Sequence, residues 1–543
     1  MKKSRTIGEI RIVVDLGESS LSPRRHNDVE VLSKHVSRLT KELVEDLAIP
    51  ASVQVTVQEP TDGDPLLVSI NGESCRMRRQ FGNGSVSAKK LAEEIADVLL
   101  QNREKLIDIT LAGSIADSIR DEQESIYLAG LSRAAFHDYL RLLVRRCFRV
   151  DRGAHLSGSA GDTPKQWNSQ DCFEEAVSSP LNLRVVVYRA VGSTDDLQHE
   201  NDNSIGDALG AMREDMFYEL GIRVPKIALS EDALLGPNEI RLQINDVRLP
   251  SMKGLAVHEF LVNETVDRLS LLNIKGRKAV NPTNETESAI VRGNDAAEAC
   301  KQASFTTWGR NEYAAHIAGV QLRKFAGSLV VPGTVEDELN QLKDETPELV
   351  DIVGARFDLK SIVRFLRYLA DEGISCRNLR GILEALLTTS TTSGVDFGKH
   401  IVFNPYAMTV TPAFNTGENE SDSVRTYAEA IRSNLKSYIS NKYTRGQSTL
   451  VVYLLDPKIE SLMKESSERA LSADEREDIL DALEQEVGDL PPSAQNPVIL
   501  TSIDARRAFR DLIAIEFPNM AVLSYQELSP DLNIQPIARI SLG

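Results

Sequence analysis

The sequence predicts a multidomain α/β and α+β protein, in which an N-terminal α+β domain precedes a longer region of alternating strands and helices. A chain of 543 residues is too long for one hydrophobic core. The usual size of about 100–200 residues per domain implies roughly three to five domains. The 41% hydrophobic content is sufficient to fill several cores. Segments with the period-2 alternation of strands and the 3.6-residue period of helices follow one another along the chain.

Composition excludes several function classes. The formal net charge of −18 and the pI near 5.1 disfavour binding to nucleic acid or to an anionic membrane surface. The longest uninterrupted apolar run, Leu450–Leu455, is far shorter than the roughly 20 residues of a spanning helix. The N-terminus lacks the apolar core of a signal peptide. We therefore expect a cytoplasmic protein whose scattered cysteines are reduced and buried: Cys75, Cys147, Cys172, Cys300 and Cys376.

Residues 1–152 are predicted to form the α+β domain. Val53, Val55 and Val57 alternate with polar residues, which predicts a half-buried strand. The pair Asn71-Gly72 predicts a hairpin turn, since both residues tolerate positive φ. Ser87 is a candidate N-cap for one helix, and a second helix is predicted over about 132–147. Residues 153–180, rich in Gly, Ser, Asp and Asn without an apolar period, are predicted to be a linker.

The remaining chain alternates between sheet and helix. A strand is predicted at 183–188 and a helix at 207–220, which Gly221 should end in the left-handed conformation. Strands at 226–229 and 239–244 follow, then a turn-rich stretch at 249–304 and an almost wholly helical one at 311–387. There Gly373 should end one helix and Ser375 should cap the next. The final part shows strand 449–455, a capping box of Ser472 with Glu475, and a strand–helix–strand unit at 497–524.

These patterns predict six segments. They are an N-terminal domain, a linker, a first α/β subdomain, a second subdomain inserted within it, a helical third subdomain and a C-terminal α/β subdomain. Their limits are 1–152, 153–180, 181–250 plus 306–328, 251–305, 329–393 and 394–543.

Three blocks carry a resemblance to a known family: Glu219–Pro225 (ELGIRVP), Pro347–Leu387 and Pro497–Leu528. In order and spacing they resemble the cytoplasmic half of the export-gate proteins of flagella and type III secretion systems, the FHIPEP family. The resemblance spans about residues 180–543. It implies a four-subdomain fold, a ring-forming homo-oligomer, and the docking of export substrates or their chaperones and of export-apparatus proteins. It implies no catalytic activity, no cofactor and no metal. The expected location is the cytoplasm, or the inner-membrane periphery through a secretion apparatus.

The resemblance also implies candidate sites. The family's chaperone-docking cleft, formed in part by a D-P-x-F-G-type block, falls at Asn281, Asn284 and Glu312. The family's acid is replaced by Asn281 and its aromatic residue by Asn284. Because an aromatic anchor is worth about 2 kcal/mol or more at an interface, the cleft has either been lost or been retuned for a different partner. Lateral contacts between copies are expected from the helical subdomain, at Phe365, Arg377 and Arg380.

Three function classes follow. The first is a docking or scaffolding platform in protein secretion. The second is a regulatory protein that reuses the ring-forming fold outside secretion, with the N-terminal unit binding the partner. This alternative arises because the N-terminal ~175 residues stand where the family has a membrane domain. The third, an enzyme without a linear motif, is disfavoured. No Walker-type loop occurs, and Val262 stands where a zinc-protease motif starting at His258 needs its second histidine.

Overall fold

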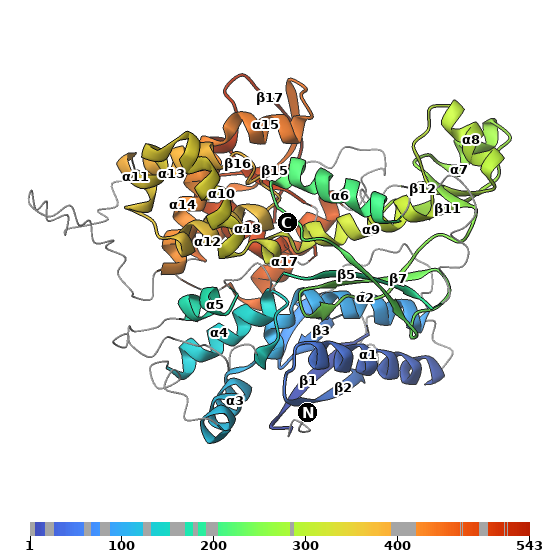
Figure 1. Ribbon diagram of the computed structural model, residues 1–543, viewed down its shortest axis with the longest axis horizontal. Helices are drawn as coiled ribbons and strands as arrows, with labels where there is room; N and C mark the ends of the chain where they lie inside the picture. Colours follow the sequence, from blue (N-terminus) through green and yellow to red (C-terminus); the bar gives the residue numbers. More distant parts are fainter. Residues whose placement is uncertain are drawn as a thin grey trace, which may run out of the picture. The chain divides into compact units, whose positions relative to one another are not determined.

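The computed structural model describes residues 6–16, 26–58, 67–76, 87–122, 132–151, 169–177, 183–191, 205–282, 287–392, 420–466, 469, 471–487, 498–514, 516–517 and 520–542. The chain divides into two compact units. The first comprises Met1–Gly210, Val224–Val257 and Arg310–Thr334, and the second comprises Ala211–Arg223, His258–Gly309 and Val335–Gly543. Within the described residues the strands form four sheets, and helices connect them (Figure 1). The predicted mixed α/β architecture is therefore confirmed.

The first sheet belongs to the N-terminal part and has the order β2-β1-β3-β4. Strand β2 runs parallel to β1, whereas β3 is antiparallel to β1 and to β4. The strands are β1 (Gly8–Asp15), β2 (Ala51–Gln58), β3 (Leu67–Ile70) and β4 (Glu73–Arg76). The predicted hairpin turn is confirmed, because Asn71 and Gly72 have φ of +51° and +86°. Two helices, α1 (His26–Asp46) and α2 (Ala88–Gln101), pack against each other and against this sheet (Figure 1).

Short helices follow: η1 (Arg103–Leu106), α3 (Ile109–Glu122), α4 (Arg133–Arg145) and α5 (Ser169–Ala176). Ser87 and Ser132 cap α2 and α4 through their side chains, so both predicted helix starts are confirmed. The linker prediction is wrong at α5, since residues 169–176 form a helix. Its Phe173 is buried and packs edge-on against Phe148. Two turns of helix are too short to show a repeating apolar period, which explains the error.

The second sheet has the order β6-β5-β7-β8, and β9 pairs with β7. Strand β5 runs parallel to β6 and antiparallel to β7. The strands are β5 (Val185–Ala190), β6 (Ala228–Asp232), β7 (Glu239–Ile244), β8 (Val247–Arg248) and β9 (Met252–Lys253). Helix α9 (Arg310–Lys324) packs on β7 and leads into η6 (Ala326–Leu329). Helix α6 (Ile205–Leu220) ends at Gly221, whose φ of +70° confirms the predicted left-handed stop.

The turn between β7 and β8 joins this sheet to the N-terminal part. Asn245 is fully buried and its side-chain amide donates to the backbone oxygens of Arg146 and Ser328, at 3.1 and 3.2 Å. Next to it, the Asp246 amide donates to the Cys147 oxygen at 3.0 Å. One turn thereby satisfies backbone groups at the ends of α4 and η6, which makes the N-terminal part an integral piece of the first unit.

An ion pair reinforces the same junction. The Arg248 guanidinium donates through Nε and a terminal nitrogen to Asp46, at 2.9 and 2.7 Å from Oδ1. The Arg248 backbone amide donates to the other oxygen of Asp46 at 2.9 Å. Asp46 ends α1, so the pair fixes that helix to strand β8. A charge-assisted bidentate pair of this geometry is stronger than an ordinary surface salt bridge.

We expect Asp46→Asn to loosen this junction by about 1–2 kcal/mol, because charge-assisted hydrogen bonds of this kind contribute that much. Hydrogen exchange of the Arg248 amide should then become about tenfold faster, as 1.4 kcal/mol corresponds to one factor of ten. The matched control is Glu45→Gln, which removes the same charge from the exposed neighbouring residue. Equal exchange rates in the two variants would show that the pair does not hold the junction.

The second unit contains the inserted subdomain, a sheet of order β11-β12-β10-β13. Its strands are β10 (Glu259–Val262), β11 (Gly276–Val280), β12 (Glu287–Arg292) and β13 (Thr307–Trp308). Helices α7 (Val266–Leu271) and α8 (Asn294–Gln302) supply part of a small core. That core contains Val262, Leu269, Ala289, Val291 and Cys300.

A helical layer follows. It consists of α10 (Pro332–Glu345), α11 (Pro347–Gly354), α12 (Leu359–Asp371), α13 (Leu379–Thr392), α14 (Glu420–Asn434) and α15 (Lys436–Thr444). Gly373, with φ of +69°, follows the end of α12 as predicted. The prediction that Ser375 caps the next helix is wrong. The side-chain oxygen of Asn378 accepts the hydrogen bond from the Gly381 amide at the start of α13. Helix α14, although predicted within the C-terminal subdomain, packs on α12 and α13.

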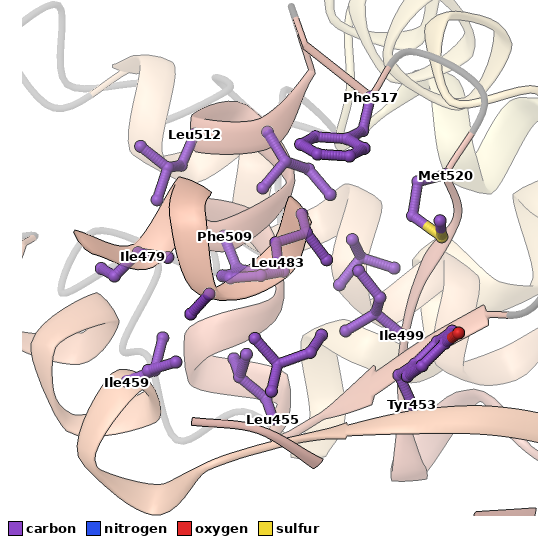
Figure 2. Close-up of a cluster of buried hydrophobic side chains, with 14 of the residues drawn as sticks. Tyr453, Leu455, Ile459, Ile479, Leu483, Ile499, Phe509, Leu512, Phe517 and Met520 are labelled. Carbon is purple, nitrogen blue, oxygen red and sulfur yellow. The ribbon is translucent and has the colours of Figure 1, made fainter. Parts of the chain in front are cut away.

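The C-terminal sheet is wholly parallel, with the order β16-β15-β14-β17. It comprises β14 (Thr449–Leu455), β15 (Val498–Thr501), β16 (Val522–Ser524) and β17 (Asn533–Ile540). Helices α16 (Pro457–Glu465), α17 (Ala473–Val487) and α18 (Ile503–Ile513) accompany it, with η7 (Tyr525–Glu527). Ser472 and Glu475 form the predicted capping box. Figure 2 shows the core between sheet and helices, where Phe509 and Leu483 meet Ile499 and Leu455.

Candidate functional site

The inserted sheet has two faces of different chemistry. Cross-strand pairing places Phe260 opposite Val291 on the face that α7 and α8 cover. The opposite face, here called the second face, carries Arg277, Ala279, Ser288, Ile290, Leu261 and Trp308. Its centre is buried at Leu261 and Ser288, and its margin is open at Arg277, which pairs with Glu259 at 3.2 Å. The exposed margin of this face is therefore charged.

Asn281 continues the alternation of β11, so it lies on the second face. It is only 3% exposed, and its Nδ2 donates to the Asn263 Oδ1 at 3.0 Å. This hydrogen bond joins the residues that directly follow β10 and β11, the two strands that flank β12. Asn281 is thus a positioning residue for the end of the sheet, and the exposed chemistry comes from its neighbours.

The other cleft residues remain predictions. Asn284 lies outside the described residues. Glu312 lies in the first turn of α9 and is partly exposed, and it belongs to the first unit whereas Asn281 belongs to the second.

The predicted lateral contacts differ in exposure. Phe365 is 1% exposed and packs against Phe357 and Tyr427, with ring centroids 5.7 and 5.6 Å away. Its side chain forms part of the core of the helical layer and is not available to a second copy. Arg377 and Arg380 are exposed, and Arg380 pairs with Glu384 one turn along α13. The lateral-contact prediction therefore depends on the two arginines.

Two of the three sequence blocks meet at Gly221. The Cys376 amide donates to the Leu220 oxygen at 2.8 Å, and the Arg377 guanidinium lies 4.8 Å from the centre of the Tyr218 ring. A Cβ at Gly221 would lie 2.1 Å from the Arg377 nitrogen, so only glycine permits this approach. The ELGIRVP block is thereby fixed to the turn between α12 and α13.

The second and third blocks meet in a buried ionic network, defined as Glu372, Glu429, Arg432, Arg506 and Glu527. Arg506 is fully buried and donates to Glu372 at 2.7 Å and to Glu429 at 2.6 Å. Arg432 donates to both oxygens of Glu527, at 2.8 and 3.0 Å, and to Glu372 at 2.7 Å. Glu372 therefore bridges both arginines and joins the helical layer to the C-terminal sheet.

The charges within the network determine the ionisation of Glu372. Burial alone would raise the pKa of this carboxyl group. The positive charges of Arg432 and Arg506, with the hydrogen bonds from Arg506, outweigh burial and hold the pKa of Glu372 well below its ordinary value of 4.5. Glu372 is consequently ionised in the folded protein, and each of its oxygens accepts hydrogen bonds.

Sequence inspection missed this network. One signal was present, because Arg506 lies at helical spacing from Phe509 and Ile513, and Arg432 from Ala428, among residues buried in the core. A charged residue at a core position of an amphipathic helix requires a buried partner. The identity of that partner is not local, since Glu372 is 134 residues from Arg506.

The described part of the chain lacks two kinds of feature. Within it, no helix is both long and apolar enough to cross a lipid bilayer. In the same residues no group of three or more His, Cys, Asp and Glu side chains is placed to bind a metal ion.

An inserted sheet, a helical layer and a parallel C-terminal sheet, the last two joined through Glu372 and Arg506, define a mixed α/β protein of the export-gate cytoplasmic type. The chain belongs to the FHIPEP family, whose model matches residues 131–399 and 408–533. The match starts at residue 131, whereas the sequence analysis predicts a start near residue 180. Helix α4 lies in this added part and is joined to the second sheet through Asn245.

Individual members of the family are similar to this chain in sequence and in structure. The low calcium response locus protein D of Yersinia pestis is 30% identical over 354 residues, which are 62% of this chain and 45% of that protein. The chain thus spans about half the length of the curated relatives it matches. The solved structure of the Chlamydia pneumoniae CdsV protein has a TM-score of 0.57 and 29% identity, over 66% of this chain and 98% of that one. A solved complex of CdsV with CdsO gives 0.56 and 28%, with the same coverage.

Proposed function

We propose that this protein is a docking or scaffolding platform for export substrates or their chaperones in a type III-like secretion apparatus. Its mode of action is binding, without catalysis or a cofactor. The observation that carries the proposal is the match over residues 131–533 together with the meeting of all three blocks around Gly221 and Glu372. Shared architecture of this kind supports a shared mode of assembly.

The proposal includes partners and location. CdsV has been solved with CdsO, which supports an export-apparatus protein as one partner of this chain. The exposed Arg377 and Arg380 are proposed to face neighbouring copies in a homo-oligomeric ring. The protein would act in the cytoplasm or at the inner-membrane periphery, through the apparatus. The second face of the inserted sheet, with Asn281 supporting it, is proposed as the docking surface.

The test is purification of the tagged full-length protein from its own host after crosslinking, followed by mass spectrometry. We expect secretion-apparatus proteins or small chaperones. Arg277→Glu should lower their recovery by about fivefold or more, because reversing a charge at an interface margin costs over 1 kcal/mol when the residue contacts the partner.

Lys278→Glu is the matched control. Lys278 neighbours Arg277 on the same strand, is exposed, and has its own ion pair with Glu287 at 3.2 Å, but it points to the other face of the sheet. Equal losses in the two variants would indicate general electrostatics and remove the second face from the proposal.

The alternative is a regulatory protein outside secretion. It is favoured by one observation, the N-terminal sheet with α1–α3, which lies outside the family match. A photocrosslinker at exposed Arg11 should then capture the partner, whereas one at Arg277 should not. Capture of secretion proteins at Arg277 would contradict this alternative.

A further inference from the structure

Strand β2 is an edge strand of the N-terminal sheet. We propose that its free edge pairs with β2 of a second copy of this chain. Among the described residues, β2 pairs with β1 alone, over all eight of its residues. The free side of such a strand presents N–H and C=O groups that an added strand can bind. The surface therefore has the chemistry of a strand-pairing site.

The edge strands of the other sheets, and the other edge of this one, differ from β2. Edge strands usually carry charges, prolines or irregularities, or are very short, because these features prevent pairing between molecules. Strand β17 contains Pro536 and Arg539 and has a register shift. Strand β11 carries Arg277 and Lys278, β6 ends in Glu-Asp, and β4 has four residues and starts with a glutamate. Strand β2, with the sequence ASVQVTVQ, has no charged residue and no proline.

The direction of the peptide groups identifies which residues would pair. The Ile7 amide donates to the Pro50 oxygen at 2.9 Å, so the carbonyl of Pro50 points toward the β1 side. Peptide groups alternate sides along a strand, so those of Gln54 and Thr56 also point toward β1. The groups of Val53, Val55 and Val57 consequently point to the free side.

The side chains of these valines indicate that the sheet is incomplete at this edge. On β1 the equivalent residues Ile10, Ile12 and Val14 are fully buried. Val53, Val55 and Val57 face the same side but are only partly buried. A further strand beside β2 would cover their exposed flanks and remove apolar surface from water.

The sequence of β2 suits pairing with a second copy of itself. With a net charge of −18, copies of this chain repel one another over much of their surface. Strand β2 is neutral, so two copies meet there without opposing like charges. In the antiparallel register centred on Val55, that residue faces its own copy, Val53 faces Val57, and Gln54 faces Thr56. Valine pairs then lie on the inner face and polar pairs on the outer face, which are favourable cross-strand combinations.

The test is crosslinking of a Val55→Cys variant in the full-length protein. In the centred register the two Cα atoms are about 5.5 Å apart, within the range of disulfides. The five native cysteines are free and buried. We expect mild oxidation with copper phenanthroline to give a disulfide-linked dimer on a non-reducing gel. Its yield should be several-fold above that of Ser74→Cys, an exposed position on the opposite edge strand β4. Equal yields would overturn the proposal.

A second variant excludes random collision. Adding Gln54→Lys and Thr56→Lys to Val55→Cys puts lysines opposite lysines across the two-fold axis, and both positions are exposed, so the fold is spared. The dimer yield should fall by about tenfold, as like charges directly opposite each other destabilise strand pairs. Rings formed through other surfaces would not align two copies of residue 55. An undiminished crosslink would mean that the cysteines meet by collision, and would refute the pairing.

Discussion

Replacing Arg506 with alanine should lower the free energy of unfolding by about 3–5 kcal/mol, the typical cost of removing one partner from a buried ion pair. Arg506 is fully buried and binds both Glu372 and Glu429. Its loss leaves the carboxylates of Glu372 and Glu429, whose side chains are 8% and 14% exposed, with one cationic partner fewer. Because Glu372 joins the helical layer to the C-terminal sheet, we expect both to unfold at lower urea concentration in denaturation experiments.

The control is Arg380→Ala, which removes an arginine from an exposed ion pair with Glu384. Exposed pairs one helical turn apart contribute about 0.3–0.5 kcal/mol, so this variant should be nearly as stable as the wild type. A loss below about 1 kcal/mol for Arg506→Ala would show that water or a rearranged side chain replaces the arginine.

The network also predicts a pH dependence. The pKa of Glu372 is lower in the folded state than its ordinary value of 4.5, so the folded state favours the ionised carboxylate. This contribution to stability is complete above about pH 4.5 and is lost as the pH falls through the folded-state pKa. The stability difference between the wild type and Arg506→Ala should therefore narrow below pH 4.5. A constant difference down to pH 3 would contradict an ionised Glu372.

Replacing Gly221 with alanine should cost about 3 kcal/mol or more, from a left-handed non-glycine residue plus a steric clash. The added Cβ would lie 2.1 Å from the nitrogen and 2.5 Å from the Cα of Arg377. Both are backbone atoms, so no change of rotamer relieves the clash. The ELGIRVP block must then separate from the turn before α13, and hydrogen exchange of the Cys376 amide should accelerate strongly.

Gly210→Ala is the matched control, and its effect should have the opposite sign. Gly210 lies inside helix α6, and a Cβ there meets nothing within 4 Å. Alanine in a helix interior is favoured over glycine by about 0.5–1 kcal/mol, so this variant should be more stable than the wild type. If both variants were destabilised equally, the close approach at Gly221 would not be the cause.

Much of the secondary structure was predictable because its signals are local. Strands β7 and β14 match the predicted residues 239–244 and 449–455. The caps at Ser87 and Ser132 involve hydrogen bonds to residues three positions away. The errors have local causes as well. Asn378, which lies three residues after Ser375, caps α13 in its place. Helix α5 has eight residues, too few to show a repeating pattern of apolar residues.

The family, the order of the main strands and helices, and several of the turns follow from local sequence, because periodicity, capping chemistry and block order are properties of neighbouring residues. The tertiary structure sets which distant groups meet. It joined Glu372 to Arg506, brought Gly221 against Arg377, placed Phe365 in a core, and left β2 at an edge. The physical reason is that a buried charge, a close backbone approach and a free strand edge depend on segments far apart in the chain, which no local pattern records.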